Sequence, residues 1–481
     1  MAGELFTLTS QSTTMQISFH GAAQTVTGSK HLISLKNGKK ILLDCGMFQG
    51  KGTQSDAWNR HFGFNPAEVS LVILSHAHID HSGLLPLLVK EGFRGEIIST
   101  PATFDLCKIL LLDSAHIQES DVAYLNKKRR KQGKNQVEPL YTTEDAQKTL
   151  SYFRRVKYNT PVELLKGVTL SYTDAGHIIG SAAVHLDIFE EGKLTKISFS
   201  GDVGRYGDMI LKSPEKFRQA DYILLESTYG DSLHERITPT EGLLLDIIQK
   251  TCVDRRGKLI IPAFSVGRTQ ELLYLLNNLS LENKLPVIPV YVDSPLSEKA
   301  TLVIKAHPWN FNNDVQEVMR NDDDPFDFPG LHFVEDAEES KSLNFRKEPC
   351  IIISASGMAE AGRIKHHIKN NILDPNNTIL LVGYSEPGSL AGRLKAGVSP
   401  VSIFGEHFDV KANVQSIQSM SAHADQQDLL RFIADQNPAI LKNIFLVHGD
   451  LETQNVFKQK LHEKGYHQVE IPSRHQHFHL K

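Results

Sequence analysis

The sequence predicts an α/β fold in two domains, one of which is inserted into the other. Near both ends of the chain, short apolar strands stop abruptly at polar clusters, as in residues 71–81 and 445–450. The middle of the chain instead repeats a β-α rhythm with short apolar strands, which is typical of a parallel doubly wound sheet. The length of 481 residues also exceeds the ~250–300 residues at which single cores stop growing.

Composition restricts the classes of function. Hydrophobic residues make up 40% and charged residues 22%, an ordinary globular balance. The formal net charge of −4 argues against a globally basic nucleic-acid binder, so a polyanionic substrate needs local charge or metal. Four scattered cysteines and a polar amino terminus predict a reduced, cytoplasmic protein, and no apolar run is long enough to cross a membrane.

The first part of the chain reads as strands and helices in alternation. Residues 17–44 form short strands, and Asn37-Gly38 is the turn of a hairpin. A helix is expected over 83–91, and helical structure over 104–158. The basic run 127–134 within it is either a solvated helix end or a contact to a substrate backbone. Further strands are expected at 71–75, 97–100, 168–172, 183–189, 196–200 and 222–225.

The middle part predicts the second domain. Expected helices cover 240–252, 269–279 and 296–306, and expected strands cover 258–261, 287–292, 351–354 and 379–382. The acidic stretch 321–330 is predicted to be an exposed loop. Polar clusters at strand ends return after about residue 412. We therefore expect a first domain from residues 1–206 and 396–481, with 207–395 inserted.

The central signal is the run from Ser75 to His81, which contains three histidines and one aspartate directly after a buried strand. Alternate side chains of such a turn point the same way. His76 and His78 can therefore face one ion, while Asp80 and His81 face a second. Imidazole and carboxylate ligands suit zinc.

Three isolated residues at strand ends extend this set. Asp44 ends an apolar strand and is expected to orient a ligand or bound water from behind. His177 lies in a glycine-flanked loop, and Asp202 follows another strand between Gly201 and Val203.

Together, in this order, these motifs resemble the metallo-β-lactamase superfamily. The resemblance implies an αββα sandwich with two zinc ions at the edge of its sheets. It implies His76, His78 and His177 on the first ion and Asp80 and His81 on the second, with Asp202 bridging both. Water between two such ions becomes nucleophilic near neutral pH. Asp80, as a ligand of the second ion, would therefore also belong to the catalytic residues.

Three further motifs resemble motifs A, B and C of the β-CASP nucleases, which would add a parallel doubly wound α/β domain to the sandwich. They contain Glu226, His423 and His448. The resemblance implies His448 as the last ligand of the second zinc. It implies His423 as the general acid, held and charged by Glu226. Ser421 would contact a phosphate oxygen.

Two loops of the middle part, around Arg268 and Arg393, resemble β-CASP loops that line the substrate cleft. Glycine allows a close backbone approach, and arginine can fork onto phosphate. Both arginines are therefore candidate phosphate contacts, with structural glycine turns as the alternative.

The resemblance implies a zinc-dependent ribonuclease that hydrolyses single-stranded RNA as an endonuclease, with 5′-exonuclease action and a homodimer left open. A DNA nuclease of the same family is the first alternative, although its third motif tends to carry valine where this chain has His448. A non-catalytic RNA-binding scaffold and a small-molecule lactonase are the others. The alternating histidines near residue 477 are expected in a closing strand or a tail, with metal binding as the alternative.

Overall fold

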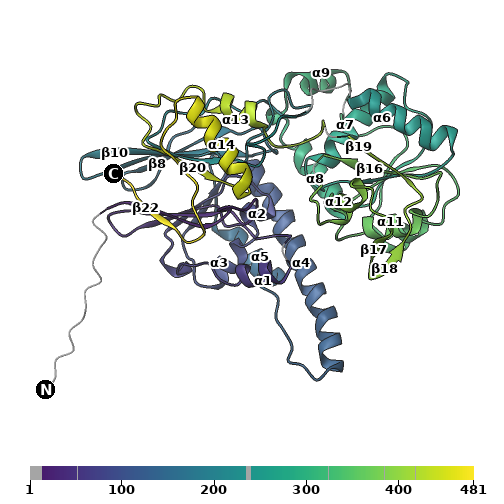
Figure 1. Cartoon of the computed structure of the whole chain (residues 1–481), viewed down its shortest axis with the longest axis horizontal. Helices are drawn as coiled ribbons and strands as arrows, with labels where there is room; N and C mark the ends of the chain where they lie inside the picture. The colour runs from purple at the N-terminus through teal and green to yellow at the C-terminus, as the bar shows by residue number, and fades with distance from the viewer. Residues whose placement is uncertain (1–13, 51, 235–239, 323, 384, 418) are drawn as a thin grey trace.

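The computed structural model describes residues 14–50, 52–234, 240–322, 324–383, 385–417 and 419–481. Two α/β domains lie side by side, and the carboxy-terminal segment folds back onto the amino-terminal one (Figure 1). The first domain is a sandwich of two sheets, each with seven strands among the described residues.

The first sheet of the sandwich has the order β22-β1-β2-β3-β4-β5-β6. Its strands are β22 (His477–His479), β1 (Gln16–Gly21), β2 (Lys30–Ser34), β3 (Lys40–Leu43), β4 (Leu71–Ile73), β5 (Glu96–Ser99) and β6 (Phe153–Arg155). The β2–β3 hairpin turns at Asn37-Gly38, as predicted. Residues 477–479 pair with β1, so these alternating histidines form the closing strand.

The second sheet has the order β21-β20-β11-β10-β9-β8-β7. Its strands are β21 (Val469–Glu470), β20 (Asn443–Val447), β11 (Tyr222–Glu226), β10 (Lys193–Phe199), β9 (Ala182–Glu190), β8 (Val168–Asp174) and β7 (Val162–Leu165). Apolar side chains from both sheets meet in one core, with Phe19, Tyr172, Phe199 and Phe445 among its largest members.

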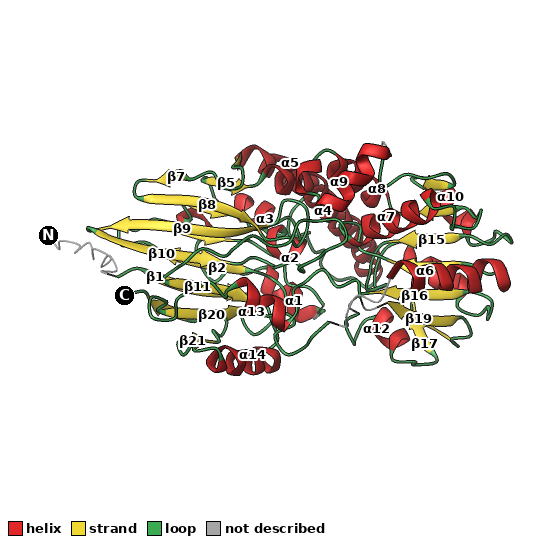
Figure 2. Cartoon of the chain, turned by 90° about the horizontal axis from the view of Figure 1, so that it is seen from above, coloured by secondary structure: helices red, strands yellow, loops and turns green. Residues whose placement is uncertain are grey.

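Helices cover the outer faces of both sheets, which confirms the αββα sandwich. The first sheet is covered by α2 (Ile79–Ser82), α3 (Leu85–Lys90), α4 (Pro101–Lys131) and α5 (Thr143–Thr149). The second is covered by α13 (Gln426–Phe432) and α14 (Leu451–Glu463), whose Leu429 and Phe457 pack under β11 and β20. Figure 2 looks onto the sandwich from above and shows strands β7, β8, β9, β10, β11, β20 and β21 of the second sheet side by side.

The inserted domain has a parallel sheet in the order β14-β13-β15-β12-β16-β19. Its strands are β14 (Leu331–Phe333), β13 (Val290–Val292), β15 (Ile351–Ser354), β12 (Leu259–Pro262), β16 (Thr378–Val382) and β19 (Asn413–Ile417). One face is covered by α6 (Thr240–Ile248), α7 (Arg268–Leu281) and α8 (Pro295–Lys305). The other is covered by α11 (Ile364–Asn371) and α12 (Leu390–Lys395). The sheet is therefore doubly wound, as expected.

Strand pairing places the two points where the chain passes between the domains elsewhere than at the expected boundaries, 206/207 and 395/396. β11 pairs with β10 and β20, so residues 222–226 lie in the sandwich. β19 pairs with β16, so residues 413–417 lie in the inserted sheet. We propose residues 227–417 as the structural insertion. The local sequence pattern does not locate either boundary, because the sheet that a strand joins depends on pairing with strands distant in the sequence.

Helix α4 ends at Lys131, within the basic run 127–134. Two local expectations need correction. Residues 153–155 are a strand at the sheet edge rather than part of a helix. The acidic stretch 321–330 is a loop, but its Phe326 and Phe328 side chains are buried in the core of the inserted domain. In the part of the chain that the structure describes, no helix is both long and apolar enough to cross a membrane.

Candidate metal centre

The candidate site lies where strands from both sheets of the sandwich end. β3 and β4 run parallel in one sheet, and β10, β11 and β20 run parallel in the other. The carboxyl ends of parallel strands in a sheet meet at one edge, where open α/β sheets usually bind ligands. Most of the predicted site residues follow these ends. They are Asp44, His76, His78, Asp80, His81, Asp202, Glu226 and His448.

Four predicted residues form a first buried cluster. The Nδ1 atom of His78 lies 3.1 Å from Nε2 of His76 and 3.2 Å from Nε2 of His177. Asp202 Oδ2 lies 3.5 Å from His76 Nε2 and 3.6 Å from His177 Nε2. Burial lowers the pKa of His78 to about 4 and those of His76 and His177 well below 6.5. These imidazoles are therefore neutral at physiological pH, the form that binds metal.

A second cluster lies on the other side of Asp202. His448 Nε2 is 3.2 Å from His81 Nε2 and 3.3 Å from Asp80 Oδ2. Asp202 Oδ1 is 3.2 Å from His81 Nε2. Burial opposes the charge on Asp80, but His81 and His448 outweigh it and lower the pKa of this carboxyl to about 2. Asp80 is therefore an anion that can ligate a cation.

Asp202 joins the two clusters. Its Oδ2 atom faces His76 and His177, whereas Oδ1 faces His81 and lies 3.5 Å from His448 Nδ1. The carboxylate is 2% exposed, and its Oδ1 atom has no hydrogen-bond partner among the described residues. A buried carboxylate oxygen without a donor costs free energy unless a cation satisfies it. The arrangement therefore fits one cation on each side of Asp202.

Hydrogen bonds orient four of the imidazoles toward these two places. His76 Nδ1 contacts Ser75 Oγ, His81 Nδ1 donates to Asp44 Oδ2, and His177 Nδ1 donates to the carbonyl of Ala422. His448 Nδ1 contacts Thr228 Oγ1. In each ring the Nε2 atom is left to face the cluster, which is how outer partners commonly fix a metal-binding histidine.

Asp44 lies behind the cluster, as expected. Its Oδ2 atom is 2.7 Å from His81 Nδ1 and also accepts a hydrogen bond from Ser29. The backbone N–H and the hydroxyl of Ser75 donate to the same carboxylate. Asp44 therefore ties the second cluster to the strand end that carries the first.

His423 and Glu226 form a third group next to Asp202. Nδ1 of His423 lies 3.3 Å from Oε1 of Glu226 and 4.0 Å from Oδ2 of Asp202. Glu226 is fully buried and accepts backbone hydrogen bonds from Val203 and Thr228. Burial alone would lower the pKa of His423, but Glu226 and then Asp202 outweigh it and raise that pKa to about 9. The imidazole is therefore charged at neutral pH.

Of the three expected phosphate contacts, Ser421 and Arg268 both lie near Tyr229, whereas Arg393 lies on α12. Ser421 is nearly buried two residues before His423, beside Tyr229. Arg268 lies close to Gly383, but its guanidinium forms a buried ion pair with Glu271. Arg393 donates to the carbonyl of Gly388 at 2.6 Å and lies 3.5 Å from Glu360 Oε1. Both guanidinium groups are thus occupied within the inserted domain, and their role as phosphate contacts stays a prediction.

Sequence reasoning missed several residues that hold these motifs together. Gly204 packs against the loop of His177, because a Cβ there would lie 1.8 Å from the carbonyl oxygen of Gly176. His234 Nε2 donates to the carbonyl of His423, and its backbone N–H donates to Asp425. The sequence offered only position as a signal for these residues. Gly204 lies close to Asp202 in the sequence, Thr228 lies close to Glu226, and His234 follows the motif that contains Glu226.

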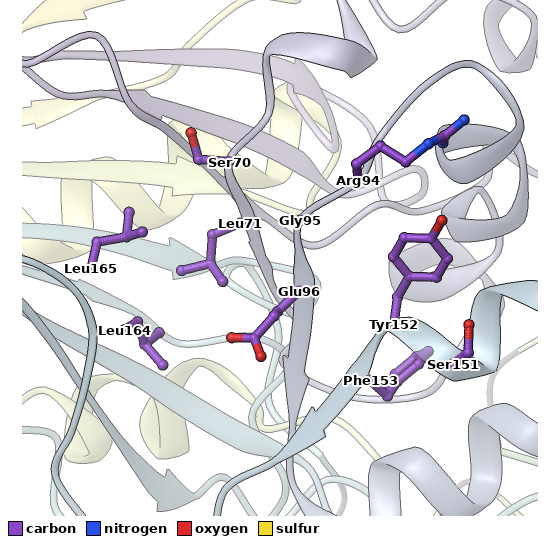
Figure 3. A pocket seen from close by; sticks show the side chains of 10 residues that line it. All are labelled: Ser70, Leu71, Arg94, Gly95, Glu96, Ser151, Tyr152, Phe153, Leu164 and Leu165. Carbon is purple, nitrogen blue, oxygen red and sulfur yellow. The ribbon is translucent and has the colours of Figure 1, made fainter.

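A separate hollow of about 400 Å³ lies at the opposite end of the sandwich strands (Figure 3). Its lining starts at the beginnings of β4, β5 and β6 rather than at their carboxyl ends. None of the groups of metal-binding side chains found among the described residues lines it. The lining residues are Ser70, Leu71, Arg94, Gly95, Glu96, Ser151, Tyr152, Phe153, Leu164 and Leu165.

Family models match three regions of the chain. Residues 32–213 match a metallo-beta-lactamase superfamily domain, and residues 269–394 match the Beta-Casp domain. Residues 408–472 match a Zn-dependent metallo-hydrolase RNA specificity domain. The third region contains both His423 and His448.

Curated relatives span nearly the whole chain. Ribonuclease TTHA0252 of Thermus thermophilus is 36% identical over 91% of this chain and 94% of its own length. Transcription termination factor FttA of Methanosarcina mazei is 30% identical over 92% of this chain and 68% of its own length. An RNase J-like protein of Methanocaldococcus jannaschii is 29% identical over 87% of this chain and 89% of its own length.

A solved structure of a protein of unknown function from Enterococcus faecalis V583 shares the fold. It has a TM-score of 0.51 and 11% sequence identity, and the match covers 97% of this chain and all of that one. The fold, the order of the motifs and the relatives agree. The chain therefore belongs to the β-CASP family of metallo-β-lactamase-fold hydrolases.

Proposed function

We propose that this protein is a zinc-dependent ribonuclease that hydrolyses phosphodiester bonds of single-stranded RNA with two metal ions. The observation that carries the proposal is the position of Asp202, which turns one carboxylate oxygen to each of two ligand clusters. The ribonuclease named among the relatives and the match to an RNA specificity domain support the choice of substrate.

The separations in the first cluster fit a tetrahedral zinc site. Ligands at ~2.0–2.2 Å from one tetrahedral ion lie ~3.3–3.6 Å from each other. The four separations around His78 and Asp202 are 3.1, 3.2, 3.5 and 3.6 Å. The second cluster, at 3.2 to 3.9 Å, is slightly looser. We assign His76, His78 and His177 to one ion and Asp80, His81 and His448 to the other, with Asp202 shared.

Two bound zinc ions would lower the pKa of a water and neutralise charge on a phosphate. Water loses a proton to solvent as its oxygen adds to phosphorus, the bond to the 3′ oxygen breaks, and the new oxygen stays on the 5′-phosphate product. The departing 3′ oxygen needs a proton. Attack and departure lie on opposite sides of the phosphorus, so the proton donor must stand apart from the metal-binding histidines.

His423 meets this requirement. Its Nδ1 atom is directed to Glu226, so the Nε2 atom on the other side of the ring carries the proton that can be transferred. The side chain is 22% exposed, whereas Glu226 is fully buried. Glu226 keeps the imidazole charged, and His423 acts as the general acid.

A complete ligand set argues against a non-catalytic scaffold, because a chain that has lost catalysis is expected to show gaps in that set, and both clusters have all of their expected ligands. His448 lies within the second cluster, at the position where DNA-cleaving relatives tend to carry valine. This supports RNA over DNA as the substrate. The flexible backbone of a single strand can bend one phosphate onto a buried centre, which a rigid duplex resists.

Product analysis tests this function. RNA labelled at either end is incubated with protein purified without added metal, with and without a chelator. We expect products with a 5′-phosphate and a 3′-hydroxyl, cleavage that stops with chelator, and recovery when zinc is returned. The His423→Ala variant, prepared in parallel, controls for contaminating nucleases. Cleavage that survives chelation or is unchanged in His423→Ala would overturn the assignment.

A further inference from the structure

Helix α4 continues far beyond the body that supports it. Its last buried residue is Ala115, and the sixteen positions 116–131 are intermediate or exposed. We call residues 116–137 the arm. Figure 1 shows the carboxy-terminal half of α4 projecting beyond both domains. Burial of an apolar face therefore does not explain why the helix is this long.

The return segment braces the arm. The Asn126 side chain donates to the carbonyl of Val137 and accepts from its N–H, both at 2.9 Å. Arg129 Nε donates to the carbonyl of Asn135 at 2.5 Å. These hydrogen bonds connect the end of the helix to the loop that follows it. The arm is consequently a preformed projection, so binding through it would not require the free energy of ordering a flexible segment.

Positive charge is concentrated at the tip of the arm. Six cations lie between residues 122 and 137, and this stretch contains no aspartate or glutamate. Because the whole chain has a formal net charge of −4, the rest of the molecule carries −10. Among the described residues, no carboxylate lies within 4.0 Å of these six side chains. They are Lys127, Lys128, Arg129, Arg130, Lys131 and Lys134.

Helix stability does not account for this cluster. Cations in a last turn do favour the helix dipole, but one or two of them suffice for that interaction. Here Lys127 faces Lys131 at i,i+4 and Arg130 at i,i+3, and like charges at these spacings repel. Six unpaired cations on a narrow tip therefore cost stability and fit an external polyanion instead.

An exposed aromatic lies one turn before the charges. The Tyr124 side chain is 77% exposed on the arm, although a tyrosine ring has little reason to face solvent. Basic side chains that track a backbone, together with exposed rings on which bases stack, are the usual features of proteins that bind single strands. The combination favours a nucleic-acid strand over an acidic protein.

The arm is connected to the candidate metal centre by the helix itself. Thr100 caps the start of α4, and the Thr100 and Thr103 hydroxyls donate to the carbonyl of Gly180, in the loop that carries His177. Near its start Asp105 also pairs with His307 of the inserted domain at 2.9 Å. At ~1.5 Å per helical residue, Lys127 lies ~39 Å along the axis from Pro101. A strand stacked at ~3.4 Å per nucleotide covers that distance with about 11 nucleotides.

We propose that the arm is a second binding site for single-stranded RNA, which holds phosphates of the substrate about 11 nucleotides from the bond that is cleaved. The proposal rests on the proposed function, since it takes RNA as the substrate. The six cations bind phosphates without reading sequence, and Tyr124 stacks on a base. The arm thus makes the enzyme prefer long RNAs and leaves the cleavage step unchanged.

The test compares two charge-matched variants. The arm variant combines Lys127→Gln, Lys128→Gln, Lys131→Gln and Lys134→Gln, all at exposed positions. The first three lie in α4, where glutamine preserves helix propensity, and Lys134 lies just after the helix. The control combines Lys39→Gln, Lys166→Gln, Lys193→Gln and Lys464→Gln, which are also exposed and lie outside the arm. Both variants lose the same charge, so a general electrostatic effect would weaken them equally.

Two measurements are made on each protein. The first is kcat/KM with RNAs of about 6 and about 30 nucleotides, of which only the longer can reach the arm. The second is binding of the longer RNA by fluorescence anisotropy at several salt concentrations, in the His423→Ala background. The binding measurement needs no cleavage, so it remains informative even if the ribonuclease assignment fails.

We expect the arm variant to lose at least about tenfold in affinity and in kcat/KM for the longer RNA, with a salt slope smaller by up to ~2.8. Its kcat/KM for the short RNA should equal that of the wild type, and the control should match the wild type throughout. Equal effects in both variants, an equal loss with short RNA, or unchanged affinity of the arm variant would each overturn the proposal.

Discussion

Two buried aspartate–histidine clusters occupy the two domains, and their polar atoms are satisfied in opposite ways. In the inserted domain, Asp293 Oδ1 accepts from Arg363 at 2.6 Å, and Oδ2 accepts from His367 and Ser340 at 2.6 and 2.5 Å. The remaining nitrogen of His367 contacts Asn344 Oδ1. In the sandwich, Asp202 is equally buried, but its Oδ1 atom has no hydrogen-bond partner in the described part of the chain.

The difference teaches that burial and residue type do not by themselves define a metal site. Asp293 is surrounded by donors, so its charge is compensated by the protein. Asp202 Oδ2 instead faces His76 and His177, whose low pKa values leave these two imidazoles unprotonated, and its Oδ1 atom has no hydrogen-bond partner among the described residues. A buried carboxylate oxygen without a hydrogen-bond partner needs a cation from outside, whereas both oxygens of Asp293 have donors.

The largest effect is expected at Asp202. The Asp202→Asn variant should lose metal from both clusters, and its turnover should fall at least ~10³-fold because both ions share this carboxylate. Elemental analysis and RNA cleavage measure the two losses. If Asp202→Asn kept two metals and near-normal turnover, the contrast with Asp293 would have no functional meaning.

His423 separates catalysis from metal binding on the sandwich side of the comparison. His423→Ala should lower kcat by ~10²–10⁴-fold, the usual contribution of a general acid. Its metal content should stay at the wild-type level, because the Nδ1 atom faces Glu226 rather than either cluster. An emptied cluster in this variant would make His423 a ligand and contradict its assigned role.

Asp44 tests how far the outer partners matter. Its carboxylate holds His81 Nδ1 at 2.7 Å, so Asp44→Asn removes a charged acceptor and leaves the ligands in place. We expect metal affinity to fall ~10–100-fold, with turnover restored by added zinc. Competition with a chelator measures the affinity. Unchanged affinity would show that Asp44 serves the fold alone.

The pH dependence tests the pairing of Glu226 with His423. The protonated imidazole is the active form, so the rate should fall as pH rises through its pKa. Protein charges alone place that pKa at about 9, and cations beside Asp202 would lower it. Glu226→Gln removes the main cause of the raised pKa and should move the basic limb down by about one unit or more. A basic limb at the same pH in both proteins would refute the pairing.

The smallest effect on cleavage is expected at Asp293. Asp293→Asn removes the partner of Arg363 and His367 in a buried network, which should lower the free energy of unfolding by about 3 kcal/mol. Thermal or urea unfolding measures this loss. Metal content and turnover, measured below the unfolding transition, should equal those of the wild type. Lost metal would mean that both clusters bind cations.

The metal-binding residues of the sandwich could be predicted from the sequence, because features of the neighbouring sequence indicate them. Each follows an apolar strand, and four of them lie within Ser75–His81. Asp293 also follows an apolar strand, β13, but its partner His367 lies within helix α11, 74 positions away, and no run of neighbouring ligand residues accompanies either of them. The pair of Arg268 with Glu271 lies at i,i+3 on one helix, a spacing that the sequence does contain.

The remaining differences between the expected and the observed structure arise from contacts between residues that are distant in the sequence. Residues 222–226 and 413–417 read equally well as strands of either domain, and only pairing with β20 and β16 decides between the sheets. His234 and Gly204 contact backbone carbonyls of the motif loops rather than motif side chains, so no residue type in the motifs pointed to them. The doubly wound sheet itself was predictable, because its strands are continuous apolar runs between helices.

Anomalous scattering at the zinc absorption edge tests the central claim most directly. Crystals of protein purified without added metal should show two peaks ~3.5–4 Å apart, one on each side of the Asp202 carboxylate. No peak should lie beside Asp293. A crystal of active enzyme with no peak at Asp202, or with one peak that touches only one of its oxygens, would contradict the two-metal account.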